Sequence, residues 1–414
     1  MARAAAPLAG LTLLAVFAAL YLRDRDLYVR ALTLWGVPPY RYPFLDWEGV
    51  SAFIECWRRG INVYVSDPCD VRGQLFNYSP LWLWLKFIPF GPVWRNIIGL
   101  TLDVTFFASL FFVFRPRGWG EAALFTVASL SSMVAFAAER ANVDLMLFVM
   151  IVAAGGLASG GLGRRLLSYG LVFFAGLLKF YPLVALMIAL RERLAILAGV
   201  AATSVVTLAL FTYGYRHELA AIGHAIPGAG FAANAFAARY LADGLSTLSP
   251  SKTAALAAFA LVAVCAGAVV VSLCRDGEWA RAFAAMERRE QTLLVMAGAI
   301  IVGCFFAGQS ANYRAIFLIP VVGGLLAMRR VSDLAGLRAR LGWLVGIILA
   351  LMWGDAFRSA IRSASPPLQL LVWCARELAW WWAVASLLAV LVVFAVQSQA
   401  LADLRDLVAR PRRE

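Results

Sequence analysis

Two carboxylates stand close together in the stretch RYPFLDWEG, residues 41–49, which is otherwise mostly aromatic and apolar. Asp46 and Glu48 come at the start of a segment with apolar residues at helical spacing, and a helix N-terminus favours an ionised carboxylate. An ionised acid positioned beside a substrate can act as a general base. Asp46 is the first candidate for that base and Glu48 the second, while a helix N-cap is the structural alternative for Asp46.

Polar side chains also interrupt later apolar segments. The stretch ERANVD contains Arg140, Asn142 and Asp144 where an apolar run begins, and LLKFYPL places Lys179 and Tyr181 in the middle of another. Ionisable groups at bilayer depth usually mark function, because burying them is costly. A solvated turn, or a structural Arg140–Asp144 pair, is the alternative for ERANVD.

A third polar group, GQSANYR, contains Gln309, Asn312 and Arg314 at the start of another apolar run. Arg314 could bind a phosphate through both guanidinium nitrogens or could snorkel to lipid headgroups. The two histidines, His217 and His224, have no third residue spaced to complete a metal site with them. The sequence therefore predicts no metal centre and no cofactor, and His224 stays a candidate proton donor or phosphate partner.

The composition indicates which kind of protein must position these residues. Of the 414 residues, 62% are hydrophobic and 15% are charged, whereas a soluble domain has about 45–50% apolar and about 25% charged residues. The chain is therefore predicted to be an all-α polytopic membrane protein. Its net charge of +13 is nearly all arginine at the ends of apolar runs, which is a topology signal rather than a sign of nucleic-acid binding.

The apolar runs predict about ten full spans. They are 7–22, 94–114, 120–138, 143–161, 194–212, 253–273, 291–307, 313–328, 341–355 and 370–396. Placing the arginine-rich connections and the basic tail 397–414 in the cytoplasm gives alternating spans with both termini inside.

Segment 166–190 is predicted to be a re-entrant helical hairpin. Arginine pairs flank it at both ends, so a single crossing would put one pair on the outer side. Pro182 breaks a helix, and Lys179 at this depth requires a cavity or a partner. Two short helices that enter and leave from the cytoplasm satisfy both constraints, with Lys179 and Tyr181 at the tip.

The outer face then carries one large loop, 23–93, with amphipathic helices, one of them lying along the bilayer surface. Loop 213–252 is rich in Gly and Ala and could cover a site as a lid. Cys56 and Cys69 share loop 23–93, where a disulfide and two free thiols are both open. No soluble accessory domain is visible, so residues 1–414 are predicted to form one membrane-embedded domain.

Several of these segments, in this order, carry a resemblance to a known family. After a first span and the loop acid Asp46 come RRGINVY with Tyr64, FNYSPLWLWLKFIP with Tyr78, LLKFYPLVAL and NYRAIFLIP. Together they resemble glycosyltransferase family 87, of the C-type membrane glycosyltransferase fold, over about residues 10–330. That family includes mannosyltransferases that use polyprenyl-phosphate mannose.

The resemblance implies an inverting sugar transfer, with mannose as the first candidate, on the outer face of the inner (plasma) membrane. The donor would be a polyprenyl-phosphate sugar, the acceptor a lipid- or glycan-linked hydroxyl, and Asp46 the base. Some family members use a late His, which this chain lacks after His224. The expected substrate-binding residues are Glu48, Arg58, Arg59, Tyr64, Tyr78, Arg140, Asn142, Asp144, Lys179, Tyr181, His224, Gln309, Asn312 and Arg314.

Two other classes of protein are alternatives. A lipid or sugar transporter would usually show broken helices at matching positions of two repeated halves, and this chain has only one broken segment. An O-antigen ligase or polymerase would carry its large outer loop late in the chain, whereas here the large loop comes first.

Overall fold

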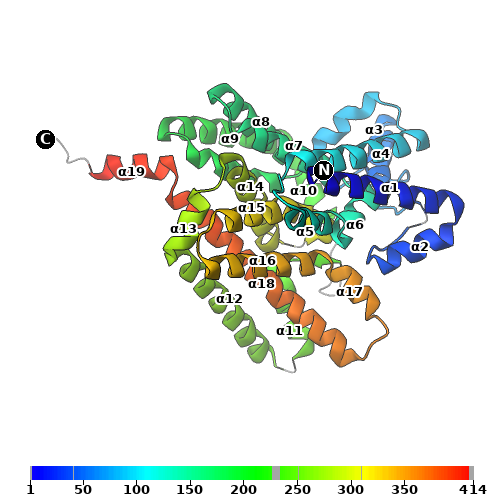
Figure 1. Cartoon of the computed structure of the whole chain (residues 1–414). Coiled ribbons are helices and arrows are strands. Elements are labelled where there is room, and N and C mark those ends of the chain that lie inside the picture. The colour runs from blue at the N-terminus through cyan, green and yellow to red at the C-terminus, as the bar shows by residue number, and fades with distance from the viewer. Residues whose placement is uncertain (1, 41, 226–233, 250, 309, 410–414) are drawn as a thin grey trace.

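The computed structural model describes residues 2–40, 42–225, 234–249, 251–308 and 310–409, and most of these residues are helical (Figure 1). Seven helices among them are long and apolar enough to cross a membrane. They are Ala2–Arg23 (η1 Ala2–Ala4 with α1 Ala5–Arg23), Val93–Phe112 (in α4 Pro92–Ser109 and η3 Leu110–Phe112), α9 Leu194–Gly214, α12 Lys252–Arg275, α14 Arg288–Phe306, α16 Ala335–Met352 and α18 Pro366–Val396. The chain is therefore a multi-pass all-α membrane protein, as the composition predicts.

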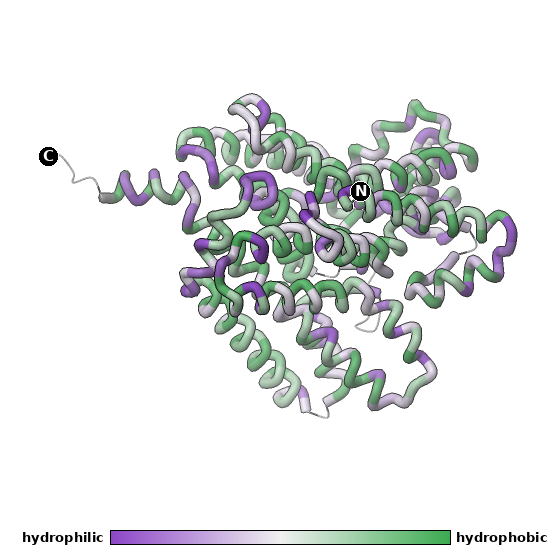
Figure 2. The backbone as a smooth tube through the Cα atoms, in the orientation of Figure 1, coloured by the Kyte–Doolittle hydropathy of each residue, from purple (hydrophilic) through white to green (hydrophobic). Residues whose placement is uncertain are grey.

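The helices α9 and α12 show most directly that lipid surrounds the bundle. Only 6% of the most apolar window of each is buried against the rest of the protein, and the tube in Figure 2 is green or white along most of their length. Soluble proteins rarely expose a continuous apolar surface of this length to water. Both helices therefore face the hydrocarbon of the bilayer, whereas two thirds of the corresponding α14 window (67%) is buried inside the bundle.

Three of the predicted spans take other forms. Residues 120–138 become two helices, α5 Trp119–Ser129 and α6 Ser132–Arg140, bent by 48° and counted as an eighth span if taken together. The helix at 143–161 is α7 Asp144–Leu157, of 14 residues, whereas 313–328 is divided between η5 Asn312–Phe317 and α15 Leu318–Val331. Fourteen residues extend about 21 Å, which is short of the roughly 30 Å of hydrocarbon. The prediction of about ten full spans thus holds for seven or eight.

The segment at 166–190 forms a helical hairpin, α8 Leu162–Leu178 followed by η4 Tyr181–Arg191, and the two helices pack against each other. Their far ends are tied by Arg165, whose Nε lies 2.6 Å from Glu192 Oε1. The Tyr169 hydroxyl donates to the same carboxylate at 2.7 Å. The chain therefore turns back on itself at Lys179, and its re-entry from the cytoplasm stays a prediction.

The large first loop contains three helices, α2 Arg25–Leu34, α3 Leu45–Arg58 and η2 Pro80–Phe87. The helix α3 is amphipathic as predicted, but its apolar residues Val50, Phe53 and Ile54 are almost completely buried in the core of the protein. Protein, rather than the bilayer surface, covers this face, because η2, α4 and α6 pack on α3. That packing fixes the orientation of Asp46.

The segment at 213–252 folds back toward the GQSANYR motif. Loop 213–252 contains α10 Arg216–Ala225, β1 Ala235–Phe236 and α11 Ala238–Leu248, while the lid expected there falls partly on residues 226–233, outside the described residues. Strand β1 pairs antiparallel with β2 Ser310–Ala311, with Ala235 opposite Ala311. The pairing holds the loop directly beside η5 Asn312–Phe317.

Short helices complete the fold: α13 Gly277–Ala284, α17 Gly354–Ala360 and α19 Gln399–Ala409. The helix α19 projects from one side of the bundle (Figure 1), and Asp403 on it accepts a hydrogen bond from the backbone N–H of Leu194 at 2.9 Å. The helix α19 therefore lies at the same end of the bundle as the start of α9.

The predicted topology can be tested by thiol labelling. We expect a membrane-impermeant maleimide to label Val65→Cys in intact cells but to label Arg164→Cys only after permeabilisation, because arginine-rich connections stay in the cytoplasm. Both positions are exposed, and a Cys265→Ser background removes the exposed native thiol. Labelling of Arg164→Cys in intact cells would invert the topology.

Candidate active site

Asp46 lies in the first turn of α3 with both carboxylate oxygens engaged. Asn142 Nδ2 donates to Asp46 Oδ2 at 2.6 Å, and Arg72 Nη1 lies 3.4 Å from Asp46 Oδ1. The N-cap residue of α3 is Phe44, which has a left-handed φ of 70° and a backbone N–H bonded to the carbonyl of Glu139. The N-cap interpretation of Asp46 is therefore wrong, and its side chain points toward the α6–α7 turn instead.

Asn142 joins Asp46 to a second carboxylate and to the hairpin tip. Its Oδ1 accepts from the backbone N–H of Asp144 at 3.0 Å and from Lys179 Nζ at 3.4 Å. Lys179 Nζ also lies 2.5 Å from Asp144 Oδ1. This geometry depends on Ala141, whose φ of 43° makes the abrupt turn that ends α6 just before Asp144 begins α7.

Arg314 brings the late motif to the same place. Its Nε is 3.9 Å from Asp144 Oδ2, and its Nη1 donates to Ser310 Oγ at 3.1 Å. Because Ser310 belongs to β2, the short sheet helps to position the guanidinium. Asn312 is buried behind it and donates a hydrogen bond to Asp355.

Three tyrosine rings surround the lysine at the centre of this cluster. The ring centroids of Tyr78, Tyr181 and Tyr313 lie 5.5, 6.0 and 5.4 Å from Lys179 Nζ. Burial, with the charge of Asp46 nearby, holds the pKa of the Tyr78 hydroxyl well above its usual range, so that ring stays neutral. Aromatic faces of this kind stabilise a desolvated cation.

The residues that come together from five separate parts of the sequence are thus Asp46, Tyr78, Asn142, Asp144, Lys179, Tyr181 and Arg314. Of the candidate residues, four others lie elsewhere in loop 23–93. Glu48 faces away from Asp46, with Oε1 3.6 Å from Arg95 Nη1. Arg58 and Arg59 both bond Glu55, and Tyr64 packs on Trp57 and Phe76.

Two further candidates, Arg140 and His224, do not join the cluster either. Arg140 Nε lies 3.0 Å from Glu139 Oε2, and its Nη2 donates to the carbonyl of Pro38, so the proposed Arg140–Asp144 pair is wrong. His224 is exposed near the end of α10. Gln309 lies outside the described residues.

Sequence reasoning left out two residues of the cluster. Arg72 and Tyr313 were not among its candidates, although Tyr313 adjoins Arg314 in the same motif. The spacing of charges gave no signal for Arg72, because its position depends on a loop without periodicity.

The accessibility of the two carboxylates separates their chemical roles. The Asp144 side chain is completely buried, whereas 13% of the Asp46 side chain is exposed. Asp46 is therefore the carboxylate that an incoming molecule can reach. A proton acceptor at Asp46, with the cations Lys179 and Arg314 behind it, suits the removal of a proton next to a departing anion.

A large cavity lies outside this cluster, with none of the cluster residues in its lining. It has a volume of about 780 Å³ and lies among α11, α16, α17 and α18. Most of its lining is apolar, and Arg358, Arg362 and Arg376 supply positive charge. Asp355 connects it to the cluster, because this residue accepts from Asn312 and lies 3.4 Å from Arg358 Nη2. Such a cavity suits an amphiphile with an anionic head.

The side chains of Cys56, Asp67 and Cys69 converge closely enough to resemble a metal site. Both sulfurs are instead joined in a disulfide, the pairing that the sequence left open. Neither sulfur is a thiolate, so neither is available as a metal ligand.

The chain was compared with protein-family models, curated proteins and solved structures, and none of the three gave a match.

Proposed function

We propose that the protein is a membrane glycosyltransferase related to glycosyltransferase family 87. It moves a sugar, with mannose as the first candidate, from a polyprenyl-phosphate donor to a lipid- or glycan-linked hydroxyl on the outer face of the membrane. The observation that carries the proposal is the single cluster of Asp46, Asn142, Asp144, Lys179 and Arg314. Asp46 and two of the motifs that carry the family resemblance, LLKFYPLVAL and NYRAIFLIP, supply three of these five residues, and ERANVD supplies Asn142 and Asp144.

In the proposed reaction Asp46 takes the proton of the acceptor hydroxyl. The acceptor oxygen forms a bond to the anomeric carbon of the sugar, and the bond from that carbon to the phosphate oxygen breaks. The electron pair leaves with the polyprenyl phosphate, so the anomeric configuration inverts. Lys179 and Arg314 stabilise the negative charge that develops on the phosphate.

The cavity lined by Arg358, Arg362 and Arg376 supports a lipid-phosphate donor. Its apolar walls fit a prenyl chain, and the positive charge of its arginines favours the approach of an anionic lipid. Positively charged residues are usually concentrated on the cytoplasmic side of a membrane protein. Binding of an anionic substrate explains why arginines would lie on the outer face.

Loss of one of these arginines should weaken donor binding. Arg362→Ala is expected to raise the KM for the donor about tenfold or more, since a hydrogen bond to a charged group contributes about 1.5–3 kcal/mol. The measurement is initial rate against donor concentration, with Arg59→Ala as the control because Arg59 lies in another loop and bonds Glu55. An unchanged KM would remove this cavity from donor binding.

A transporter is the second candidate, because a buried lysine–carboxylate pair such as Lys179–Asp144 also occurs in proton- and ion-coupled transporters. Purified protein in detergent distinguishes the two, since a micelle holds no ion gradient. We expect it to transfer or hydrolyse labelled polyprenyl-phosphate mannose. Failure to cleave any polyprenyl-phosphate hexose would overturn the proposed function.

A further inference from the structure

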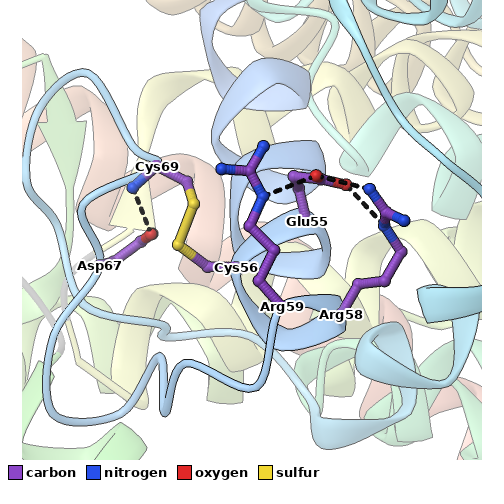
Figure 3. The surroundings of a disulfide bond; sticks show 6 residues. All are labelled: Glu55, Cys56, Arg58, Arg59, Asp67 and Cys69. Carbon is purple, nitrogen blue, oxygen red and sulfur yellow. Dashed lines mark hydrogen bonds and ion pairs between the residues drawn. A yellow bond between two sulfur atoms is a disulfide. The ribbon is translucent and has the colours of Figure 1, made fainter.

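The disulfide joins the helix that carries Asp46 to the loop that carries Arg72. Cys56 lies near the end of α3, and Cys69 lies thirteen residues later with the two Cα atoms 5.9 Å apart (Figure 3). Arg72 follows Cys69 after two residues. The covalent bond therefore fixes the loop to the helix close to the point where Arg72 turns back toward Asp46.

Aspartate side chains around the disulfide hold the backbone in turns. Asp67 Oδ1 accepts from the backbone N–H of Cys69 at 3.0 Å. Asp70 Oδ2 accepts from the backbone N–H groups of Arg72 and Gln74 at 3.2 and 2.9 Å. Hydrogen bonds of this kind hold an irregular loop in one conformation.

The Arg72 side chain spans from this turn to the active carboxylate. Its Nε lies 3.6 Å from Asp70 Oδ1, and its Nη1 lies 3.4 Å from Asp46 Oδ1. Gly49, one turn after Asp46, gives it room, because a Cβ there would lie 2.5 Å from Arg72 Nη2. Arg72 and Asn142 thus hold the two oxygens of Asp46 from opposite sides.

We propose that Arg72 is the positioning residue of Asp46 and that the Cys56–Cys69 disulfide keeps it there. The protein then works at full rate only in an oxidising compartment, because reduction releases the loop and the arginine with it. The inference about catalysis rests on the proposed function, whereas the coupling of the disulfide to Asp46 does not.

The other contacts of the loop fix its turns and its ends. Residues 59–79 contain no helix or strand, Val63 and Phe76 are buried in the core, and Asp67 and Asp70 hold turns within the loop. The disulfide is the covalent link between these turns and α3. Without the disulfide the entropy of the loop favours many positions of Arg72. A displacement of about 1 Å at a catalytic group can cost about 100-fold in rate.

The test compares Arg72→Ala, the pair Cys56→Ser/Cys69→Ser, and all three substitutions together. We expect each of the first two to lower kcat about 10- to 100-fold and the triple variant to be no slower than Arg72→Ala. Arg72→Lys should recover part of the rate, because it restores the charge. Arg59→Ala, next to the same disulfide but bonded to Glu55 (Figure 3), is the control that should keep the wild-type rate.

A second readout does not depend on transferase activity. We expect a water-soluble carbodiimide to modify Asp46 more in each variant, and in the reduced wild type, than in the oxidised wild type, as measured by mass spectrometry. Reduction should add nothing in Arg72→Ala. Equal modification in all forms, or additive effects of the arginine and the cysteines on kcat, would overturn the inference. Coupled modification without any sugar transfer would overturn the proposed function alone.

Discussion

Replacing Asp46 with Asn is expected to lower kcat by about 10²–10⁴-fold, the usual contribution of a general base. The amide cannot take a proton. It has the shape of the carboxylate, but its single oxygen can accept from only one of the two donors, Asn142 Nδ2 and Arg72 Nη1. The KM for the donor should change little, because the arginine-lined cavity is formed by other helices. The measurement is transfer of labelled sugar by purified protein at saturating donor.

Glu48→Gln is the matched control, since it removes a charge two residues away on the same helix. Glu48 lies beside Arg95 and outside the cluster, so this variant should keep a rate within a few-fold of the wild type. Asp46→Asn with full activity would exclude Asp46 from the mechanism. A loss confined to Glu48→Gln would make Glu48 the base.

The part of the site that the sequence predicts consists of polar residues inside apolar segments. Asp144 and Lys179 could be selected because a charge at that depth requires a partner, and the structure places Lys179 Nζ 2.5 Å from Asp144 Oδ1. What the sequence could not specify is which partner each group takes. Arg140 is closer to Asp144 in the chain, but the turn at Ala141 directs it to Glu139.

Other residues show why exposed charges mislead. Arg58 and Arg59 were expected to bind the substrate, yet Glu55 at helical spacing bonds both. Their hydrogen bonds, that of Arg58 foremost, lower the pKa of Glu55 to about 2. The spacing of three and four residues was a readable signal for a local pair. Arg72 gave no such signal, because its partner Asp46 is brought to it by tertiary structure.

The sequence predicts about ten full spans, more than the seven or eight that the structure supports. An apolar run does not distinguish a full crossing from a short buried helix. Residues 143–161 are apolar apart from Asp144 and Ser159, but the helix begins at Asp144 and ends at Leu157, before the glycines at 160 and 161. The short helix brings the Asp144 end, rather than a hydrophobic midpoint, to the site.

Replacing Lys179 with Met is expected to destabilise the protein by about 3–5 kcal/mol, the usual cost of leaving a buried charge without its partner. Asp144 is completely buried, so water cannot replace the lysine. Arg314 compensates poorly, since its Nε is 3.9 Å from the other carboxylate oxygen. The free energy of unfolding of the purified protein, measured in detergent, tests this expectation.

The double variant Lys179→Met/Asp144→Asn tests whether the pair itself is responsible. Removing both charges should cost less than the sum of the two single changes, by about 0.5–3 kcal/mol, because neither charge is left alone. The exposed pair Arg239–Asp243 provides the control, and the same substitutions there should change stability little. Additive costs at Lys179 and Asp144 would mean that each residue is held by other groups, and the centre of the proposed site would then not be a coupled pair.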